Sequence, residues 1–193
     1  MPRSATTDKR QELIEIASKL FYEQGFGATG IKQVIEEAGI AKGTFYSHFR
    51  SKEDLGVAWL KARHMYWSEL LDEKIGSLGG AAVKLEACFE FLREWMQECG
   101  YRGCVFINTM AETPQADSPM RAEVSAHKLG LRRQFEGLTI EHFSGLSEEL
   151  ARSKGRFFFV LFEGALVESQ LTRELWPIDA ALQEVRRQLG STT

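Results

Sequence analysis

Two short helical patterns, separated by only three residues, constrain the fold of this chain more than any other feature. Residues 31–38 carry apolar side chains at the spacing of an amphipathic helix. Residues 42–49 show a second pattern, with Phe45 and Phe49 four positions apart and therefore on one face. Gly39 opens the connection between the two segments. Because helices this short are unstable alone, a third element must cover their apolar faces.

The residues before this pair predict the covering helix. Thr7 or Asp8 is expected to cap its start, and Gly25 is expected to end it. Thr29 is the expected cap of the following helix. Three helices whose last two meet at a tight turn form a helix-turn-helix unit. The apolar positions of the covering helix are Leu13, Ile16, Ala17, Leu20 and Phe21.

The remaining sequence predicts six more helices. Ser51 and Asp54 form a capping-box pattern at the start of a long helix. Pro177 is expected to end another long helix, which begins near Ser147. We therefore expect an all-α fold of about nine helices, with a helix-turn-helix domain at residues 1–51 and a helical ligand-binding and dimerisation domain at residues 52–193. The six predicted helices cover residues 52–75, 81–98, 104–112, 118–143, 147–176 and 178–189.

The distribution of charge favours a specific DNA contact. The chain has 24 Lys and Arg residues against 27 Asp and Glu residues, a formal net charge of −3. A nonspecific DNA binder would usually be basic throughout. From Gly39 to Lys52, however, the chain has four basic residues and no Asp or Glu, and the next acid is Glu53. A small basic patch on an acidic chain is typical of sequence-specific DNA binding. The residues of this patch are Lys42, His48, Arg50 and Lys52.

Several other classes of protein lack their sequence signatures here. No apolar run approaches the roughly 18 residues of a membrane span, and the polar start shows no signal-peptide pattern, so we expect no membrane contact and a cytoplasmic location. Three cysteines without C-x-x-C spacing predict neither a disulfide framework nor a metal site, and no cofactor is expected. Common hydrolase, metalloprotease and phosphate-loop motifs are missing, so an enzyme is not expected. A small helical enzyme that pairs Cys104 with a histidine is the remote alternative.

One segment resembles a known family. Residues 39–55 read GIAKGTFYSHFRSKEDL and closely resemble the recognition-helix region of TetR-family repressors. The resemblance extends back through Phe21, Gly25 and Thr29, and it covers roughly the first 55 residues. It implies a homodimer in which each subunit places its third helix in the major groove of one palindromic half-site. It also implies an inducer pocket in the core domain and a dimer interface built from the last two long helices.

The resemblance also indicates which residues contact DNA. Two lysines are expected to meet phosphates, and two hydroxyl groups to bond to the DNA backbone, which positions the helix without reading sequence. A glycine allows close approach, and the polar side chains beside it can reach base edges. The alternative is a solvated helical face on which Tyr46 is simply packed. The predicted DNA contacts are Thr29, Lys42, Gly43, Thr44, Tyr46, Ser47, His48 and Lys52.

Aromatic residues in the second part of the chain suggest a pocket for an apolar or aromatic effector. Asn108 and Glu112 are among the residues that could add polar contacts, although most of the aromatic residues must belong to the ordinary core. The predicted function is a ligand-responsive repressor, released from an operator when an effector changes the spacing of the two recognition helices. The predicted effector residues are Trp59, Tyr66, Phe89, Trp95, Cys104, Phe106, Asn108, Phe135 and Phe162.

Cys104 supports an alternative form of sensing. It follows Gly103 at a predicted helix start, with Arg102 nearby, and both a helix N-terminus and a cation favour a reactive thiolate. Residues 102–108 are similar to a segment of some TetR-family members that sense electrophiles or oxidants, and also to members that do not. The alternative function is therefore a thiol-based repressor, and the competing interpretation of Cys104 is a small buried apolar residue.

The last two helices are expected to form the dimer interface. Gly164 and Ala165 are small and permit a close approach between helices. The surrounding residues offer more apolar surface than one buried side of a helix needs, and such surface would be a liability on a monomer. Burial inside one subunit is the alternative. The apolar residues that carry this argument are Phe158, Leu161, Leu166 and Leu171.

Overall fold

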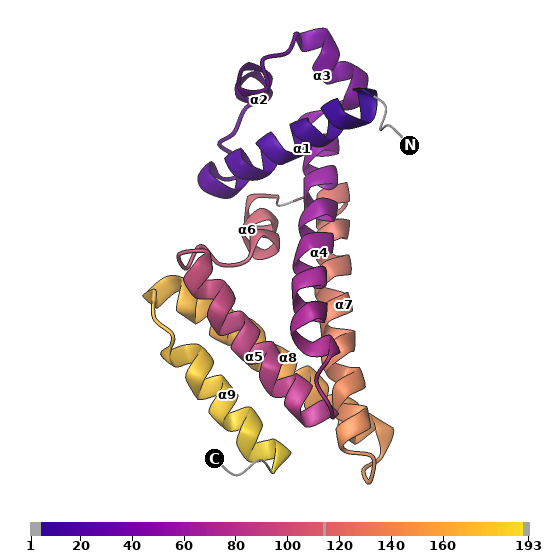
Figure 1. The fold of residues 1–193 in the computed structure, drawn as a ribbon, viewed down its shortest axis with the longest axis vertical. Coiled ribbons are helices and arrows are strands. Elements are labelled where there is room, and N and C mark those ends of the chain that lie inside the picture. Colours follow the sequence, from indigo (N-terminus) through magenta and orange to yellow (C-terminus); the bar gives the residue numbers. More distant parts are fainter. Residues whose placement is uncertain (1–4, 114, 191–193) are drawn as a thin grey trace. The chain divides into compact units, whose positions relative to one another are not determined.

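The computed structural model describes residues 5–113 and 115–190, which form nine helices and no strand (Figure 1). The predicted all-α fold is confirmed. The helices of this described part are α1 (Ala5–Gln24), α2 (Ile31–Glu37), α3 (Lys42–His48), α4 (Lys52–Gly76), α5 (Ala81–Glu98), α6 (Val105–Glu112), α7 (Pro119–His142), α8 (Glu148–Thr172) and α9 (Trp176–Leu189).

Local sequence signals account for several helix ends. Gly25 and Gly39 adopt φ values of +97° and +59°, the left-handed conformation that ends α1 and α2. The Ser51 hydroxyl accepts a hydrogen bond from the Asp54 amide, and the Asp54 carboxylate accepts one from the Arg50 amide. The predicted capping arrangement at the start of α4 is therefore confirmed, with the returning bond one residue earlier than in the standard box.

Three predicted helix ends are wrong. Helix α1 begins at Ala5, so Thr7 and Asp8 lie inside it rather than at its start. The cap of α2 is Gly30, without a side-chain hydrogen bond, and not Thr29. Helix α8 ends at Thr172, where the next residue is left-handed. Pro177 instead lies in the first turn of α9, where its missing N–H leaves no hydrogen bond unmade.

The described residues form two compact units, and each has its own core. The first unit contains the described residues up to Tyr66 together with Val105–Ala126. In it, α1 packs on α2, and the Phe21 ring meets the Trp59 ring edge to face at 5.2 Å. Leu13, Val34 and Phe45 are 0–1% exposed, so one apolar core holds the first three helices.

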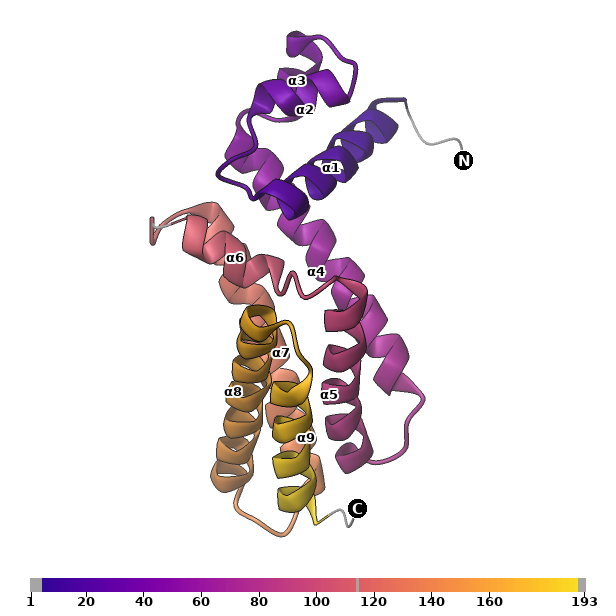
Figure 2. The ribbon, with the colours of Figure 1, turned by 90° about the vertical axis from the view of Figure 1, so that its left-hand side faces the viewer.

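The second unit contains Trp67–Cys104 and the described residues from His127 onward. In it, α5, α8 and α9 lie side by side (Figures 1 and 2). The rings of Phe89, Phe135 and Phe162 form a buried cluster, with centroids 5.5–6.0 Å apart. This cluster joins α5, α7 and α8.

Helices α7 and α8 approach each other closely at Gly155. A Cβ atom at this position would lie 2.6 Å from the Cα atom of Glu136 on α7. The Glu136 carboxylate accepts hydrogen bonds from Arg152 at 3.0 Å and from Arg156 at 3.1 Å. Burial would raise the pKa of Glu136, but these bonds hold it below its ordinary value. A charged contact therefore lies directly beside this close approach of the two helices.

We predict that Gly155→Ala destabilises the protein, because the backbone atoms of α7 cannot move aside as a flexible side chain could. The expected loss is about 1–3 kcal/mol in the free energy of unfolding, measured by urea denaturation. Gly130→Ala on α7 is the matched control, since its Cβ would meet open space. The control should be neutral or stabilising by up to about 1 kcal/mol. Equal stability of the two variants would contradict the packing described.

Candidate nucleic-acid interface

Helix α3 presents a polar face above a buried one. Phe45 is fully buried and Phe49 nearly so, and these two residues fix the helix to its unit. Lys42, Tyr46 and Ser47 are exposed, and the Lys42 ammonium lies 5.9 Å from the centre of the Tyr46 ring. No acidic residue lies in the first turn of α3. Figure 1 shows the short turn that leads from α2 into this helix.

The other predicted contacts on α3 lie on or beside this face. Gly43 is exposed, and Thr44 and His48 are half-buried. The Ser47 hydroxyl donates a hydrogen bond of 2.7 Å to the Thr44 carbonyl within the helix. A Cβ atom on Gly43 would meet nothing within 4 Å, so the protein itself leaves the space above Gly43 open. The six predicted contacts on α3 therefore lie together on one short helix.

The two predicted contacts outside α3 are engaged within the protein. Thr29 is fully buried, and its hydroxyl donates a hydrogen bond of 2.9 Å to the Gly25 carbonyl. The Lys52 ammonium donates to the Gly27 carbonyl at 3.3 Å and lies 4.3 Å from the centre of the Phe26 ring. Burial lowers the pKa of Lys52, and the nearby Glu112 carboxylate opposes that change. Both side chains therefore hold the loop between α1 and α2 through hydrogen bonds to its carbonyl groups.

Glu112 is a residue whose role the sequence did not indicate. It was expected to add polarity to a pocket, but its carboxylate accepts a hydrogen bond from the Gly27 amide. A Cβ atom on Gly25 would lie 2.9 Å from one of its oxygens, so the carboxylate sits tightly against this loop. The last residue of α6 thereby holds the segment that leads into α2. The glycines at positions 25 and 27 were the only sequence signal for so close an approach.

The predicted effector residues are distributed over both units. Phe89, Phe135 and Phe162 are fully buried in the aromatic cluster of the second unit. In the first unit, Trp59 and Phe106 are also core residues, each 2% exposed. All five rings therefore belong to the buried core of their units. Tyr66 and Asn108 lie in the first unit, Tyr66 being 50% exposed and Asn108 half-buried, while Trp95 and Cys104 lie in the second.

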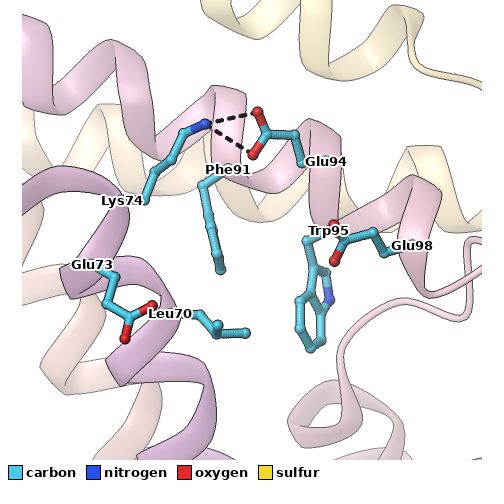
Figure 3. Close-up of a pocket in the computed structure, with 7 residues that line it drawn as sticks. All are labelled: Leu70, Glu73, Lys74, Phe91, Glu94, Trp95 and Glu98. Carbon is cyan, nitrogen blue, oxygen red and sulfur yellow. Dashed lines mark hydrogen bonds and ion pairs between the residues drawn. The ribbon is translucent and has the colours of Figure 1, made fainter.

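Trp95 lines a cleft in the second unit, between the last turns of α4 and helix α5 (Figure 3). The cleft has a volume of about 340 Å³, within the range of small-molecule sites. The Lys74 ammonium is paired with the Glu94 carboxylate across it, at 2.7 and 2.9 Å. The residues that line the cleft are Leu70, Glu73, Lys74, Phe91, Glu94, Trp95 and Glu98.

Cys104 lies beside a cation that the sequence did not identify. The Lys128 ammonium, on α7, bonds to the Glu163 carboxylate at 2.7 Å and is also within hydrogen-bonding reach of the Cys104 sulfur. Burial would lower the pKa of Lys128, but Cys104 and Glu163 together raise it above its ordinary value. Lys128 is therefore a cation beside Cys104 in addition to Arg102, the cation that the sequence predicted there.

The outer face of α8 is apolar. Its exposed side chains recur every three or four residues along one line, with Gly164 in the middle and open space above it. Phe158, Ala165 and Leu166, which were expected at a subunit interface, are instead buried within the unit. Leu171 remains exposed as expected. The line, here called the α8 stripe, consists of Phe157, Val160, Gly164, Val167 and Leu171.

None of the described helices combines the length and apolar character that crossing a bilayer requires. Within the same residues, no group of three or more His, Cys, Asp or Glu side chains is arranged to hold a metal ion.

Comparison with known proteins finds a family match in the N-terminal part of the chain. The sequence profile of bacterial regulatory proteins of the tetR family matches residues 13–58, which include α2, α3 and the turn between them. A TetR-family transcriptional regulator from Streptomyces coelicolor shares the fold, with a TM-score of 0.86 and 25% identity over 96% of this chain and 97% of that one. Residues 13–58 therefore match the tetR family, and the whole chain resembles TetR-family transcriptional regulators in sequence and fold.

The relatives of this chain include two proteins named as repressors. The HTH-type transcriptional repressor NemR of Escherichia coli (strain K12) is 25% identical over 192 residues, 96% of each chain. The HTH-type transcriptional repressor DhaR of Mycobacterium sp. (strain GP1) is 26% identical over 196 residues, 98% of this chain and 96% of its own. These relatives regulate transcription and are not enzymes, so the enzyme alternative is set aside.

Proposed function

We propose that this TetR-family regulator is a ligand-responsive repressor that binds palindromic DNA as a homodimer and is released by a small apolar or aromatic effector. The observation that carries the proposal is the polar, acid-free face of α3, held outward by Phe45 and Phe49. The repressor names of NemR and DhaR support the same direction of regulation. In this proposal residues 1–51 bind DNA, and residues 52–193 bind the effector and the second subunit.

The proposed roles on α3 follow from exposure and chemistry. Lys42 meets a phosphate, and the Tyr46 hydroxyl donates to the DNA backbone. Gly43 lets the backbone of α3 approach the duplex, since no side chain separates them. The side chains of Thr44, Ser47 and His48 reach toward base edges in the major groove. Because the Thr29 and Lys52 side chains are engaged within the protein, we assign them to positioning the loop before α2.

We predict that Lys42→Ala with Tyr46→Ala weakens binding to duplex DNA from upstream of the protein's own coding sequence by at least tenfold. Loss of the lysine should also reduce the salt dependence of binding by about one phosphate contact. Fluorescence anisotropy over a range of salt concentrations measures both effects. Lys32→Ala is the matched control, because Lys32 is an exposed lysine on α2. Full affinity in the double variant, or affinity that does not change with salt, would contradict the proposed interface.

The α8 stripe supports the homodimer. Its apolar residues recur at the spacing that packs one helix against another, and Gly164 permits a close approach. On a monomer this stripe would expose a contiguous apolar surface. Helix α9 buries the apolar residues Ile178, Leu182 and Val185 within its own unit. We therefore assign most of the subunit contact to α8. A twofold pairing would present two α3 helices to half-sites about 34–36 Å apart.

We predict that Val160→Glu converts the protein to a monomer, because two buried carboxylates would face each other across a twofold contact. Light scattering coupled to size-exclusion chromatography measures the molar mass at micromolar concentration. Val83→Glu is the matched control, since Val83 on α5 is 50% exposed but does not belong to the α8 stripe. A dimer that persists in Val160→Glu, or a purely monomeric parent protein, would exclude α8 as the interface.

The contact between Cys104 and Lys128 favours thiol sensing as the second candidate function. An adjacent ammonium stabilises a thiolate, which is the reactive form of cysteine. With an electrophile such as N-ethylmaleimide, the sulfur bonds to a ring carbon, the carbon–carbon double bond opens, and the other carbon takes a proton. Addition changes the contact of the sulfur with Lys128, whose ammonium also bonds to Glu163. Cys88 is a poor competitor, because burial raises its pKa to about 12.

We predict that N-ethylmaleimide releases the parent protein from DNA and fails to release Cys104→Ser. Cys99→Ser is the control, because Cys99 is a half-buried thiol whose sulfur is within hydrogen-bonding distance of the Met96 carbonyl. Mass spectrometry of the intact protein counts the added maleimide groups, and anisotropy follows the bound DNA. Release of Cys104→Ser to the same extent as the parent protein would rule out the thiol mechanism.

A further inference from the structure

The cleft between α4 and α5 combines an aromatic wall with an acidic rim. The Phe91 and Trp95 rings are stacked, with centroids 6.2 Å apart and planes inclined by 24°. Trp67 also packs on Phe91, edge to face at 5.3 Å. Figure 3 shows both rings extending into the cleft, with the Leu70 side chain opposite. These residues form an apolar surface for a bound molecule.

The charge of the rim is strongly one-sided. Glu73, Glu94 and Glu98 are opposed by one cation, Lys74, so the lining has a formal charge of −2. Lys74 is paired with Glu94. In the part of the chain that the structure describes, neither Glu73 nor Glu98 has an ion-pair partner. Figure 3 shows Glu73 on the α4 side of the cleft and Glu98 beside the Trp95 ring.

The aromatic wall and the acidic rim favour ligands of the same charge. The faces of aromatic rings are negatively polarised and attract cations, most strongly at tryptophan. Carboxylates at the mouth of a cleft attract the same ligands and repel anions. A neutral apolar molecule would satisfy the wall but gain nothing from the two unpaired carboxylates. The cleft is therefore matched to a molecule that is apolar over most of its surface and carries a positive charge.

We propose that this cleft binds a hydrophobic organic cation, a quaternary ammonium or phosphonium with aromatic or alkyl groups. The apolar groups pack on Leu70, Phe91 and Trp95, and the positive charge meets Glu73 and Glu98. This assignment rests on the proposed function in one respect, because it names the class of effector that releases the repressor from DNA. Binding to the cleft itself does not depend on that function.

The test compares two probes of the same shape and opposite charge, tetraphenylphosphonium and tetraphenylborate. Isothermal titration calorimetry of the whole protein should show saturable binding of the phosphonium, at least tenfold tighter than that of the borate. Raising the salt concentration should weaken binding of the phosphonium, because part of the attraction comes from exposed charges. Equal affinity for the two probes, or no saturable binding of the phosphonium, would overturn the assignment.

Variants locate the binding site. Glu73→Gln with Glu98→Gln keeps the shape of the cleft and should weaken phosphonium binding at least tenfold. Trp95→Leu should weaken it about 3- to 30-fold, the range expected for a cation–π contact. Glu69→Gln is the matched control, an exposed carboxylate on α4 that does not line the cleft. Circular dichroism and DNA affinity without a probe confirm that each variant is folded. Unchanged binding in the double glutamine variant would place the cation elsewhere and overturn the proposal.

DNA binding separates this proposal from the proposed function. A protein that binds the phosphonium in the cleft but never binds DNA would disprove the repressor and leave the cation site standing. A protein that binds DNA but not the phosphonium would disprove the cation site and leave the repressor standing. For a protein that binds both, release of DNA at saturating phosphonium supports the cleft as the effector site. Saturation of the cleft without release would overturn that assignment.

Discussion

Burial of Phe45 is the contact on which the DNA-facing surface depends. Helices α2 and α3 have seven residues each, too few to be stable in water. They persist because Phe45 is fully buried in a core that also holds Leu13 and Val34. The same burial sets the rotation of α3, because residues three or four positions from an anchored ring share its side of the helix. Tyr46 and Ser47, one and two positions after Phe45, therefore lie off that side of the helix and are exposed.

Sequence reasoning recovered the helices because their signals are local. Apolar spacing, caps and loop residues predicted the described helices, and glycines such as Gly25 and Gly39 marked ends that require a positive φ. It failed where two local signals compete within a few residues. Thr29 can cap a helix in principle, but in this loop its hydroxyl bonds backward to Gly25. Pro177 can follow one helix or begin the next, and only packing decides between these roles.

The candidate sites, like the helices, were predictable only where the signal lies within a few residues. The outward face of α3 followed from the spacing of two phenylalanines. The partners of Lys52 and Cys104 did not, because Glu112 and Lys128 are remote in sequence and meet them only in the folded chain. In α8, apolar residues occur on nearly every side, so spacing alone could not decide whether Phe157 or Phe158 is buried.

The carboxylate of Glu112 has a consequence for the energetics of DNA binding. It attracts Lys52 and holds the amide of Gly27, so the end of α6 and the loop before α2 are fastened by one group. A phosphate near Lys52 would compete with that carboxylate for the same ammonium. Thermodynamic linkage then requires reciprocity. Whatever withdraws the end of α6 makes an extra cation available to a nucleic acid, and a nucleic acid that takes the cation loosens α6.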